Sequence, residues 1–133
     1  PVDLPNRVRD LASTITRGLD NPYEKTIAVE DYLRTNYRYN LKITPPPFNA
    51  DGVDHFLFTL GEGYSEYFAS AMAVMLRTLD VPARLAVGYT TGEQVEEKPI
   101  FAVRDSHSHA WLEISFPKYG WIPFEPTPGA SLP

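Results

Sequence analysis

The stretch that decides the fold runs from residue 63 to residue 79 and reads GYSEYFASAMAVMLRTL. From about Ser65 to Leu79 it has the pattern of a helix that is apolar on nearly every side. A helix without a polar face is a buried helix. Its alanines allow other elements to approach closely. We therefore expect this helix at the centre of the domain, with the remaining elements packed around it.

Two amphipathic helices are predicted ahead of the central one. In the first, apolar residues recur at i, i+3, i+4 and i+7, with Pro5 in the first turn and Gly18 close to the end. The second begins with Asn21 as N-cap, Pro22 as first helical residue and Glu24 as capping-box partner. The apolar positions are Val8, Leu11, Ala12, Ile15 and Leu19 in the first, and Ala28, Val29, Tyr32, Leu33 and Tyr37 in the second.

Beyond the central helix the hydrophobic period changes to that of strands, expected at 84–89, 100–104, 109–116 and 121–125. Helices first and consecutive strands afterwards indicate an α+β domain with an antiparallel sheet. A proline-rich loop, roughly 40–54, is expected before the central helix, and loops of that length are often functional.

Length and composition predict one globular domain. The chain has 133 residues, of which 43% are hydrophobic and 22% charged, so it is not a mainly disordered sequence. We expect a single domain over 1–133, with its core at 5–128 and the start of a linker at 129–133. Because the chain begins at Pro1 without an initiator Met or signal peptide, we expect a piece of a longer protein. The net charge of -5 argues against nucleic-acid and anionic-membrane partners, and no apolar run approaches the ~20 residues of a membrane span.

Ser65 falls where a glycine-containing loop enters the central helix. A helix N-terminus offers backbone N–H groups and a positive dipole end, which stabilise an anion. A nucleophile at this position would gain from both, and neighbouring amides could form half of an oxyanion hole. Serine is also one of the best N-cap residues, and on local sequence alone that structural role is the simpler interpretation.

His109 and Glu125 are candidate partners across a hairpin. If 116–120 form a five-residue loop, Ser115 pairs with Trp121, and Glu125 lies near His109 on the diagonal. A carboxylate there can hold one imidazole nitrogen and set its tautomer. A four-residue loop would place Glu125 on the other face, so the hypothesis includes a prediction of strand register.

A metal site is the alternative interpretation of the histidines. His107 and His109 form a strand pair that His55 could complete as a third zinc ligand, but no acidic or cysteine motif accompanies them. The acidic residues of 93–97 lack the ordered spacing of a calcium loop. Cysteine is absent, which excludes a thiolate ligand and a thiol nucleophile. We expect no metal and no other cofactor.

Taken together, these segments resemble the bacterial transglutaminase-like domain, a member of the papain-like thiol acyltransferase and peptidase group. The family shows a Gly-x-Cys-x-x-Phe-Ala helix start, then Leu-Arg, Pro-Ala-Arg and Gly-Tyr. A His-Ala-Trp-x-Glu strand and a Gly-Trp-x-x-Phe-Asp-Pro-Thr strand follow. The likeness extends from about Pro5 to Pro128. The matching segments are 63–69, 76–77, 82–84, 88–89, 109–113 and 120–127.

The resemblance implies a catalytic triad at Ser65, His109 and Glu125, with two departures from the family. The nucleophilic cysteine aligns with Ser65, and the usual aspartate aligns with Glu125. A family thiolate attacks a glutamine carboxamide or peptide carbonyl, and an amine or water then resolves the thioester. Because a serine hydroxyl is far less acidic than a thiol, we expect this chain to be inactive or very slow.

Three interpretations of Ser65 stay open: an engineered Cys→Ser replacement, a natural pseudoenzyme that keeps the groove, and a working serine acyltransferase. The alternative function is a non-catalytic peptide- or protein-binding module. The partners implied are a protein or peptide substrate and an amine acceptor, without nucleic acid or direct membrane contact. The resemblance also implies an extracytoplasmic domain, periplasmic or cell-surface, of a bacterial membrane protein. Trp111 and Trp121 are expected in the core or groove wall, and Arg77 and Arg84 in structural ion pairs.

Overall fold

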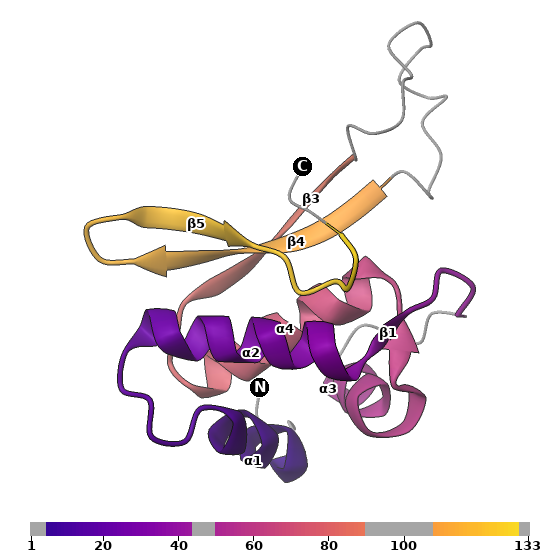
Figure 1. Cartoon of the computed structure of the whole chain (residues 1–133), viewed down its shortest axis with the longest axis horizontal. Coiled ribbons are helices and arrows are strands. Elements are labelled where there is room, and N and C mark those ends of the chain that lie inside the picture. Colours follow the sequence, from indigo (N-terminus) through magenta and orange to yellow (C-terminus); the bar gives the residue numbers. More distant parts are fainter. Residues whose placement is uncertain (1–4, 44–49, 90–107, 131–133) are drawn as a thin grey trace, which may run out of the picture.

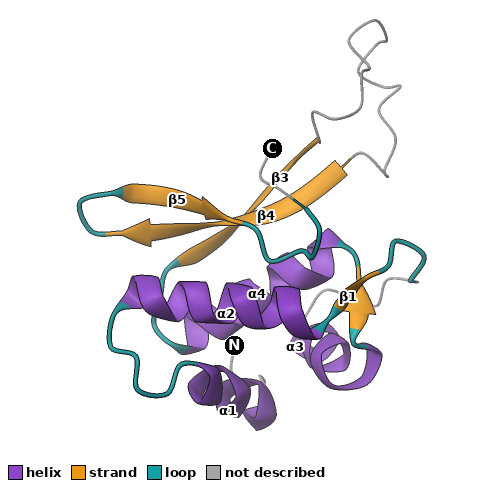
Figure 2. Ribbon diagram, viewed as in Figure 1, coloured by secondary structure: helices purple, strands orange, loops and turns teal. Residues whose placement is uncertain are grey.

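The computed structural model describes residues 5–43, 50–89 and 108–130. Within these ranges the helices gather on one side of a three-stranded antiparallel sheet, which confirms the α+β class (Figures 1 and 2). In this described part no helix has the length and apolar character needed to cross a lipid bilayer. The elements are α1 (Asn6–Ile15), α2 (Pro22–Asn36), β1 (Arg38–Tyr39), α3 (Ala50–His55), the π-helix η1 (Phe56–Leu60), β2 (Glu62–Gly63), α4 (Ser65–Thr78), β3 (Ala83–Tyr89), β4 (Ser108–Phe116) and β5 (Gly120–Phe124).

The central helix is α4, and it is buried as the sequence predicts. It packs against β3 and β4 on one side and against α1, α2 and α3 on the others. Because neighbours surround it, apolar residues are needed around most of its circumference. Its buried residues are Ser65, Tyr67, Phe68, Ala69, Ala71, Met72, Ala73, Met75 and Leu76.

The two leading helices differ from expectation in small ways. Asn21 caps α2 as predicted, and its side-chain oxygen accepts the N–H groups of Tyr23 (2.7 Å) and Glu24 (3.3 Å). Pro5, expected in the first turn of α1, is instead its N-cap residue. The chain leaves α1 before Leu19, because Gly18 adopts the left-handed conformation of a turn (φ 82°).

The proline-rich loop expected over 40–54 ends earlier than predicted, because its last residues are helical. Residues 50–60 form α3 and η1. The physical reason is a short helical pattern at Val53, Phe56, Leu57 and Leu60, of which the first three are buried. This segment leads into β2, which pairs in parallel with β1. Residues 44–49 lie outside the described residues.

The predicted register of the β4–β5 hairpin is confirmed, since Ser115 pairs with Trp121. Phe116 and Gly120 also pair, so the connecting loop contains only residues 117–119. Tight hairpin loops of this kind need residues at positive φ, and Lys118 and Gly120 both adopt such values (φ 75° each). The predicted strand at 100–104 lies outside the described residues.

The face of the sheet away from the helices carries an exposed cluster. Arg84 forms the expected ion pair, with Glu113 (2.8 Å), and its guanidinium stacks on Trp121, 3.9 Å from the ring centroid. Trp121 is 42% exposed and therefore lies outside the core, which leaves the groove wall as the remaining part of its predicted location. Within the described ranges, the hydrogen bond recorded for Arg77 goes to the carbonyl of Ala83 (3.0 Å) and not to a carboxylate, because the last turn of α4 meets the start of β3 there.

Arg7 of α1 and Asp54 of α3 form a two-bond ion pair (2.7 and 2.6 Å), and this hydrogen bonding lowers the pKa of Asp54. A lowered pKa adds stability above the unfolded value of 3.8, and the gain is lost as the pH falls through the folded value. We therefore expect Asp54→Asn to lower the thermal midpoint at pH 7 and to have little effect near pH 2.

Circular dichroism melts at the two pH values measure this difference. Asp10→Asn, an exposed carboxylate on α1, is the matched control. If Asp54→Asn lowered the thermal midpoint equally at both pH values, packing and not the ion pair would be responsible for the decrease.

Candidate active site

Ser65 is the first residue of α4 and is only 3% exposed. Tyr64 is the N-cap residue, so the interpretation of Ser65 as a helix cap was wrong by one position. The Ser65 hydroxyl instead accepts the backbone N–H of Ala110 in β4 (3.0 Å) and donates to Oε1 of Glu66 (2.9 Å). The start of α4 is thereby joined to the strand that carries His109.

The chain segment that leads into Ser65 requires glycine at position 63. Gly63 is buried in β2, beside Tyr39 of β1. A Cβ atom on Gly63 would lie 2.7 Å from two ring atoms of Tyr67 and 3.0 Å from its Cβ atom. Such distances are well inside van der Waals contact, and Tyr67 belongs to α4, so the helix itself would have to shift. Gly63 therefore fixes how closely the incoming chain approaches the helix start.

His109 and Glu125 are in direct contact. Nε2 of His109 and Oε1 of Glu125 form a hydrogen bond, and both side chains are nearly buried. Trp111 lies beside His109 on the same face of β4, with the two rings 6.4 Å apart and 17° from parallel. Because Glu125 engages Nε2, Nδ1 is the ring nitrogen left for a reacting group.

Glu125 is also held through its main chain, in a way that sequence reasoning missed. Its N–H donates to Oε2 of Glu30 (2.9 Å), and its carbonyl accepts from Arg34 (2.9 Å). Its second carboxylate oxygen, Oε2, accepts the N–H of Thr127 (3.0 Å). In sequence, Glu30 and Arg34 look like an ordinary i, i+4 pair on a helix surface, so no signal distinguishes them.

The predicted site residues are thus brought together in two linked pairs. His109 and Glu125 contact each other, and Ser65 is bonded to Ala110, the residue next to His109. Both hydrogen bonds recorded for the Ser65 hydroxyl go to groups other than the imidazole.

The metal alternative receives no support from the residues that can be placed. His55 is exposed at the end of α3, and Nε2 of His109 is engaged by Glu125. His107 lies outside the described residues. Across 5–43, 50–89 and 108–130, no three His, Cys, Asp or Glu side chains are grouped so that they could hold a metal ion.

A helix that begins at a candidate nucleophile, and that packs on an antiparallel sheet whose histidine meets a carboxylate just beyond the last strand, is the arrangement of the papain-like class of folds. Residues 9–126 match the family model of the transglutaminase-like superfamily. The chain therefore belongs to the transglutaminase-like superfamily.

Two curated relatives are similar in sequence. The uncharacterized protein YebA of Bacillus subtilis is 44% identical over 139 aligned positions, which cover 100% of this chain and 19% of YebA. A protein-glutamine gamma-glutamyltransferase of Pseudomonas aeruginosa is 35% identical over 122 positions, which cover 91% of this chain and 18% of that protein. The chain thus spans about a fifth of the length of these relatives.

Solved structures agree with this assignment. The periplasmic domain of TgpA from Pseudomonas aeruginosa, bound to ethylmercury, has a TM-score of 0.76 at 33% identity, over 95% of this chain and 45% of that one. A structure from Cytophaga hutchinsonii has a TM-score of 0.69 over 92% of this chain and 37% of that one. At 23% identity, the second supports the fold alone.

We expect Gly63→Ala to destabilise the domain by roughly 1–3 kcal/mol, because overpacking moves the start of α4 against its neighbours. Urea unfolding followed by tryptophan fluorescence measures the loss. The matched test is a double-mutant cycle with Tyr67→Ala, which removes the ring that the new methyl group would meet. Additive free energies in the cycle would contradict a direct clash between these two residues.

Proposed function

We propose that this domain is a transglutaminase-like catalytic module that transfers or hydrolyses acyl groups of protein or peptide amides. In this proposal residue 65 is the nucleophile position, His109 the base and Glu125 the residue that orients it. The observation that carries the proposal is the buried His109–Glu125 hydrogen bond, one residue away from the contact between Ser65 and Ala110.

The site chemistry follows from these contacts when a thiol occupies position 65. The Ala110 N–H, which donates to the Ser65 oxygen, would donate to sulfur and favour the thiolate. Nδ1 of His109 takes the thiol proton, and Glu125 stabilises the resulting imidazolium through Nε2. The N–H of residue 65, at the positive end of α4, supports the oxyanion.

Each half of the reaction is balanced. The thiolate attacks the carboxamide carbon, the C–N bond breaks, and the imidazolium gives its proton to the departing ammonia or amine. The thioester that forms is then attacked by an amine or by water, which loses a proton to the imidazole while the C–S bond breaks. An amine gives a cross-link, and water gives deamidation or hydrolysis.

Serine at position 65 disables this scheme. The hydroxyl donates its hydrogen to Glu66 and accepts from Ala110, so it is not presented to the base. An alcohol also depends on the base at the moment of attack far more than a thiol does. An engineered replacement and a natural pseudoenzyme both fit this geometry, whereas a working serine acyltransferase would have to turn the hydroxyl toward His109.

The relatives support a protein substrate and an extracytoplasmic location. One relative carries the name protein-glutamine gamma-glutamyltransferase, and the similar TgpA structure is a periplasmic domain. We extend both properties to this chain as part of the proposal, with a glutamine side chain or peptide amide as acyl donor. The net charge of -5 argues against a nucleic-acid partner.

A second candidate function is a non-catalytic module that binds peptides or proteins. The observation that favours it is the state of Ser65, whose side chain is nearly buried and has both hydrogen bonds satisfied within the domain. A domain kept for binding would have no need to free this hydroxyl.

Ser65→Cys tests the proposal, because the chain has no cysteine and the new thiol is then its only one. We expect iodoacetamide to alkylate it at pH 7 at least ten times faster than it alkylates the same thiol in the Ser65→Cys/His109→Ala variant. The reason is that a neighbouring imidazolium raises the thiolate fraction. We also expect ammonia release from a glutamine peptide by Ser65→Cys alone. Equal alkylation rates in the two variants would exclude an activating histidine and favour the binding module.

A further inference from the structure

We propose that Glu30 and Arg34 on α2 are positioning residues for the active site, which hold the segment 125–130 so that Glu125 meets His109. We call this pair of side chains the α2 clamp. The inference rests on the proposed function, because it assigns the pair a role in orienting the base of that same site. Neither residue contacts the candidate nucleophile in any interaction that the structure records.

The clamp binds main-chain atoms on both sides of Glu125. Oε2 of Glu30 accepts the Glu125 N–H at 2.9 Å. A single nitrogen of Arg34, Nη1, lies within hydrogen-bond distance of three carbonyls, those of Glu125 (2.9 Å), Thr127 (2.8 Å) and Ala130 (3.1 Å), so that one of its two N–H groups is shared between two of them. These four contacts fix where the backbone of the segment lies, and none of them uses the Glu125 carboxylate.

The segment needs such support because the sheet does not provide it. β5 ends at Phe124, so ladder hydrogen bonds to β4 stop one residue before Glu125. Residues 125–130 belong to no helix or strand, yet Glu125 is 5% exposed and Thr127 is fully buried. Buried main-chain groups outside regular structure require other partners. In this segment Arg34 and Glu30 are partners of that kind.

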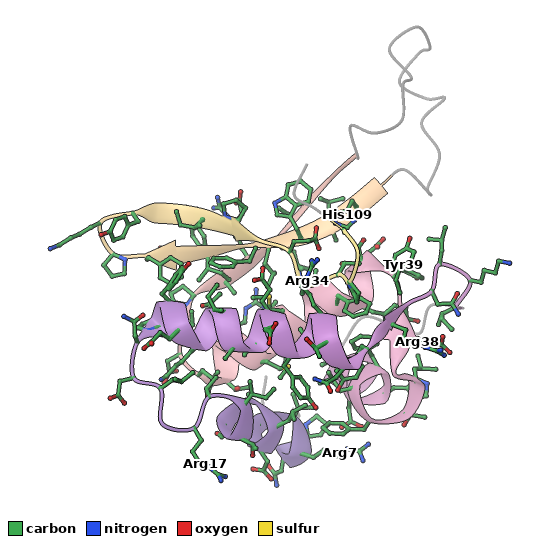
Figure 3. All side chains as sticks on the ribbon, viewed as in Figure 1. Arg7, Arg17, Arg34, Arg38, Tyr39 and His109 are labelled. Carbon is green, nitrogen blue, oxygen red and sulfur yellow. The ribbon has the colours of Figure 1, made fainter. Side chains whose placement is uncertain are left out.

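α2 is well suited to hold the segment in one place. Glu30 and Arg34 are four residues apart, so they lie on the same side of the helix, one turn from each other. Figure 3 shows Arg34 and His109 on the same side of α2, toward the sheet, while Arg7 and Arg17 point away on the opposite side. Since α2 packs against the buried helix α4, the clamp and Ser65 are tied to the same rigid pair of helices.

The charges of the clamp match the groups it binds. A carboxylate accepts the N–H and a guanidinium donates to the carbonyls, and each charged partner makes a stronger bond than a neutral one. The pKa of Glu30 is raised, first by burial and further by the negative charges of Glu125 and Asp31, and the Glu125 N–H and the charge of Arg34 oppose this rise. Arg34 therefore also favours the carboxylate form of Glu30 that accepts the bond.

The consequence for the site is that the clamp holds Glu125 without occupying either oxygen of its side chain. Oε1 meets His109 and Oε2 accepts the Thr127 N–H, which sets the rotation of the carboxylate. If the clamp were removed, the carboxylate would have to follow a freer backbone. A small displacement of an orienting group is enough to misplace the imidazole it holds.

The first experiment uses the chain as it is and requires no catalysis. Proton NMR follows the N–H of the His109 imidazole, which exchanges slowly with water only while it is buried and bonded to Glu125. We expect Arg34→Met, which keeps the aliphatic stem and removes the donors, to raise that exchange rate at least tenfold. Arg34→Lys should show a smaller rise, because an ammonium can still donate to part of the carbonyl set.

Two comparisons separate positioning from general stability. Arg17→Met removes an exposed arginine on the far side of the molecule and should leave the His109 signal unchanged. Glu30→Gln keeps an oxygen acceptor for the Glu125 N–H and should preserve slow exchange, whereas Glu30→Met should lose it. The Glu30 pair keeps the inference testable even if Arg34→Met does not fold.

The second experiment repeats the Arg34 and Glu30 changes in the Ser65→Cys chain and measures alkylation by iodoacetamide at pH 7. We expect Arg34→Met and Glu30→Met to slow it at least fivefold and Glu30→Gln to restore most of the rate. If the thiol of Ser65→Cys itself is alkylated slowly, the proposed function is overturned. The clamp is still supported in that case if Arg34→Met raises the exchange rate of the His109 N–H. The clamp would be overturned if Arg34→Met and Glu30→Met changed neither the fast alkylation of the thiol nor the slow exchange of the His109 N–H. This conclusion would hold whatever the thermal midpoints of the two variants.

Discussion

The burial of α4 is the constraint on which the rest of the structure depends. Its apolar surface is covered on one side by the sheet and on the others by helices. Fully burying a large side chain such as Phe68 or Met72 stabilises the fold by about 1.5–3 kcal/mol. The helix cannot rotate or slide without losing several such contributions at once. Ser65, at its first position, is fixed in space by residues that take no part in chemistry.

Hydrogen bonds to main-chain groups then connect this fixed point to the segments that carry the other two candidate site residues. The Ala110 N–H reaches the Ser65 hydroxyl, and the two side chains from α2 reach the backbone around Glu125. His109 lies between these anchored segments, with its ring against Trp111. The candidate site is therefore assembled from three parts of the chain that are far apart in sequence, and main-chain groups take part in the hydrogen bonds that hold them.

The sequence was sufficient for the parts of the fold that follow from periodicity and pairing. The all-round apolar pattern of 65–79 predicted the buried helix, and alternation in 109–116 fixed the strand and its faces. The hairpin register followed once Ser115 was placed opposite Trp121, and that register carried Glu125 toward His109. These predictions succeed because side-chain burial dictates them, and burial is encoded by residue type.

The sequence was insufficient where backbone groups make the contacts. The hydrogen bond from the Ala110 N–H to Ser65 cannot be predicted from residue type, since any residue but proline at position 110 would supply the N–H. Arg34 binds three carbonyls whose positions depend on the whole fold. The cap at Tyr64 rather than Ser65 reflects the same limit, because a one-residue change in a helix start rotates the side chain by about 100°.

The short parallel pairing of β1 with β2 has a consequence for how the domain can vary in length. Arg34 binds the segment after β5, and this is the first of two contacts that follow closely along the chain. The second is the pairing of Tyr39 with Gly63, which leads into Ser65. One residue inserted within α2 after Arg34 would turn the two contacts by about 100° relative to each other and separate them by about 1.5 Å. One residue inserted after the end of α2 at Asn36 would shift the pairing of β1 with β2 by one position and turn its side chains to the other face. The turn that precedes Asn21 has no such second attachment among its recorded contacts. Insertions and deletions in relatives of this fold should therefore collect ahead of α2 and be absent from the stretch between Arg34 and Tyr39.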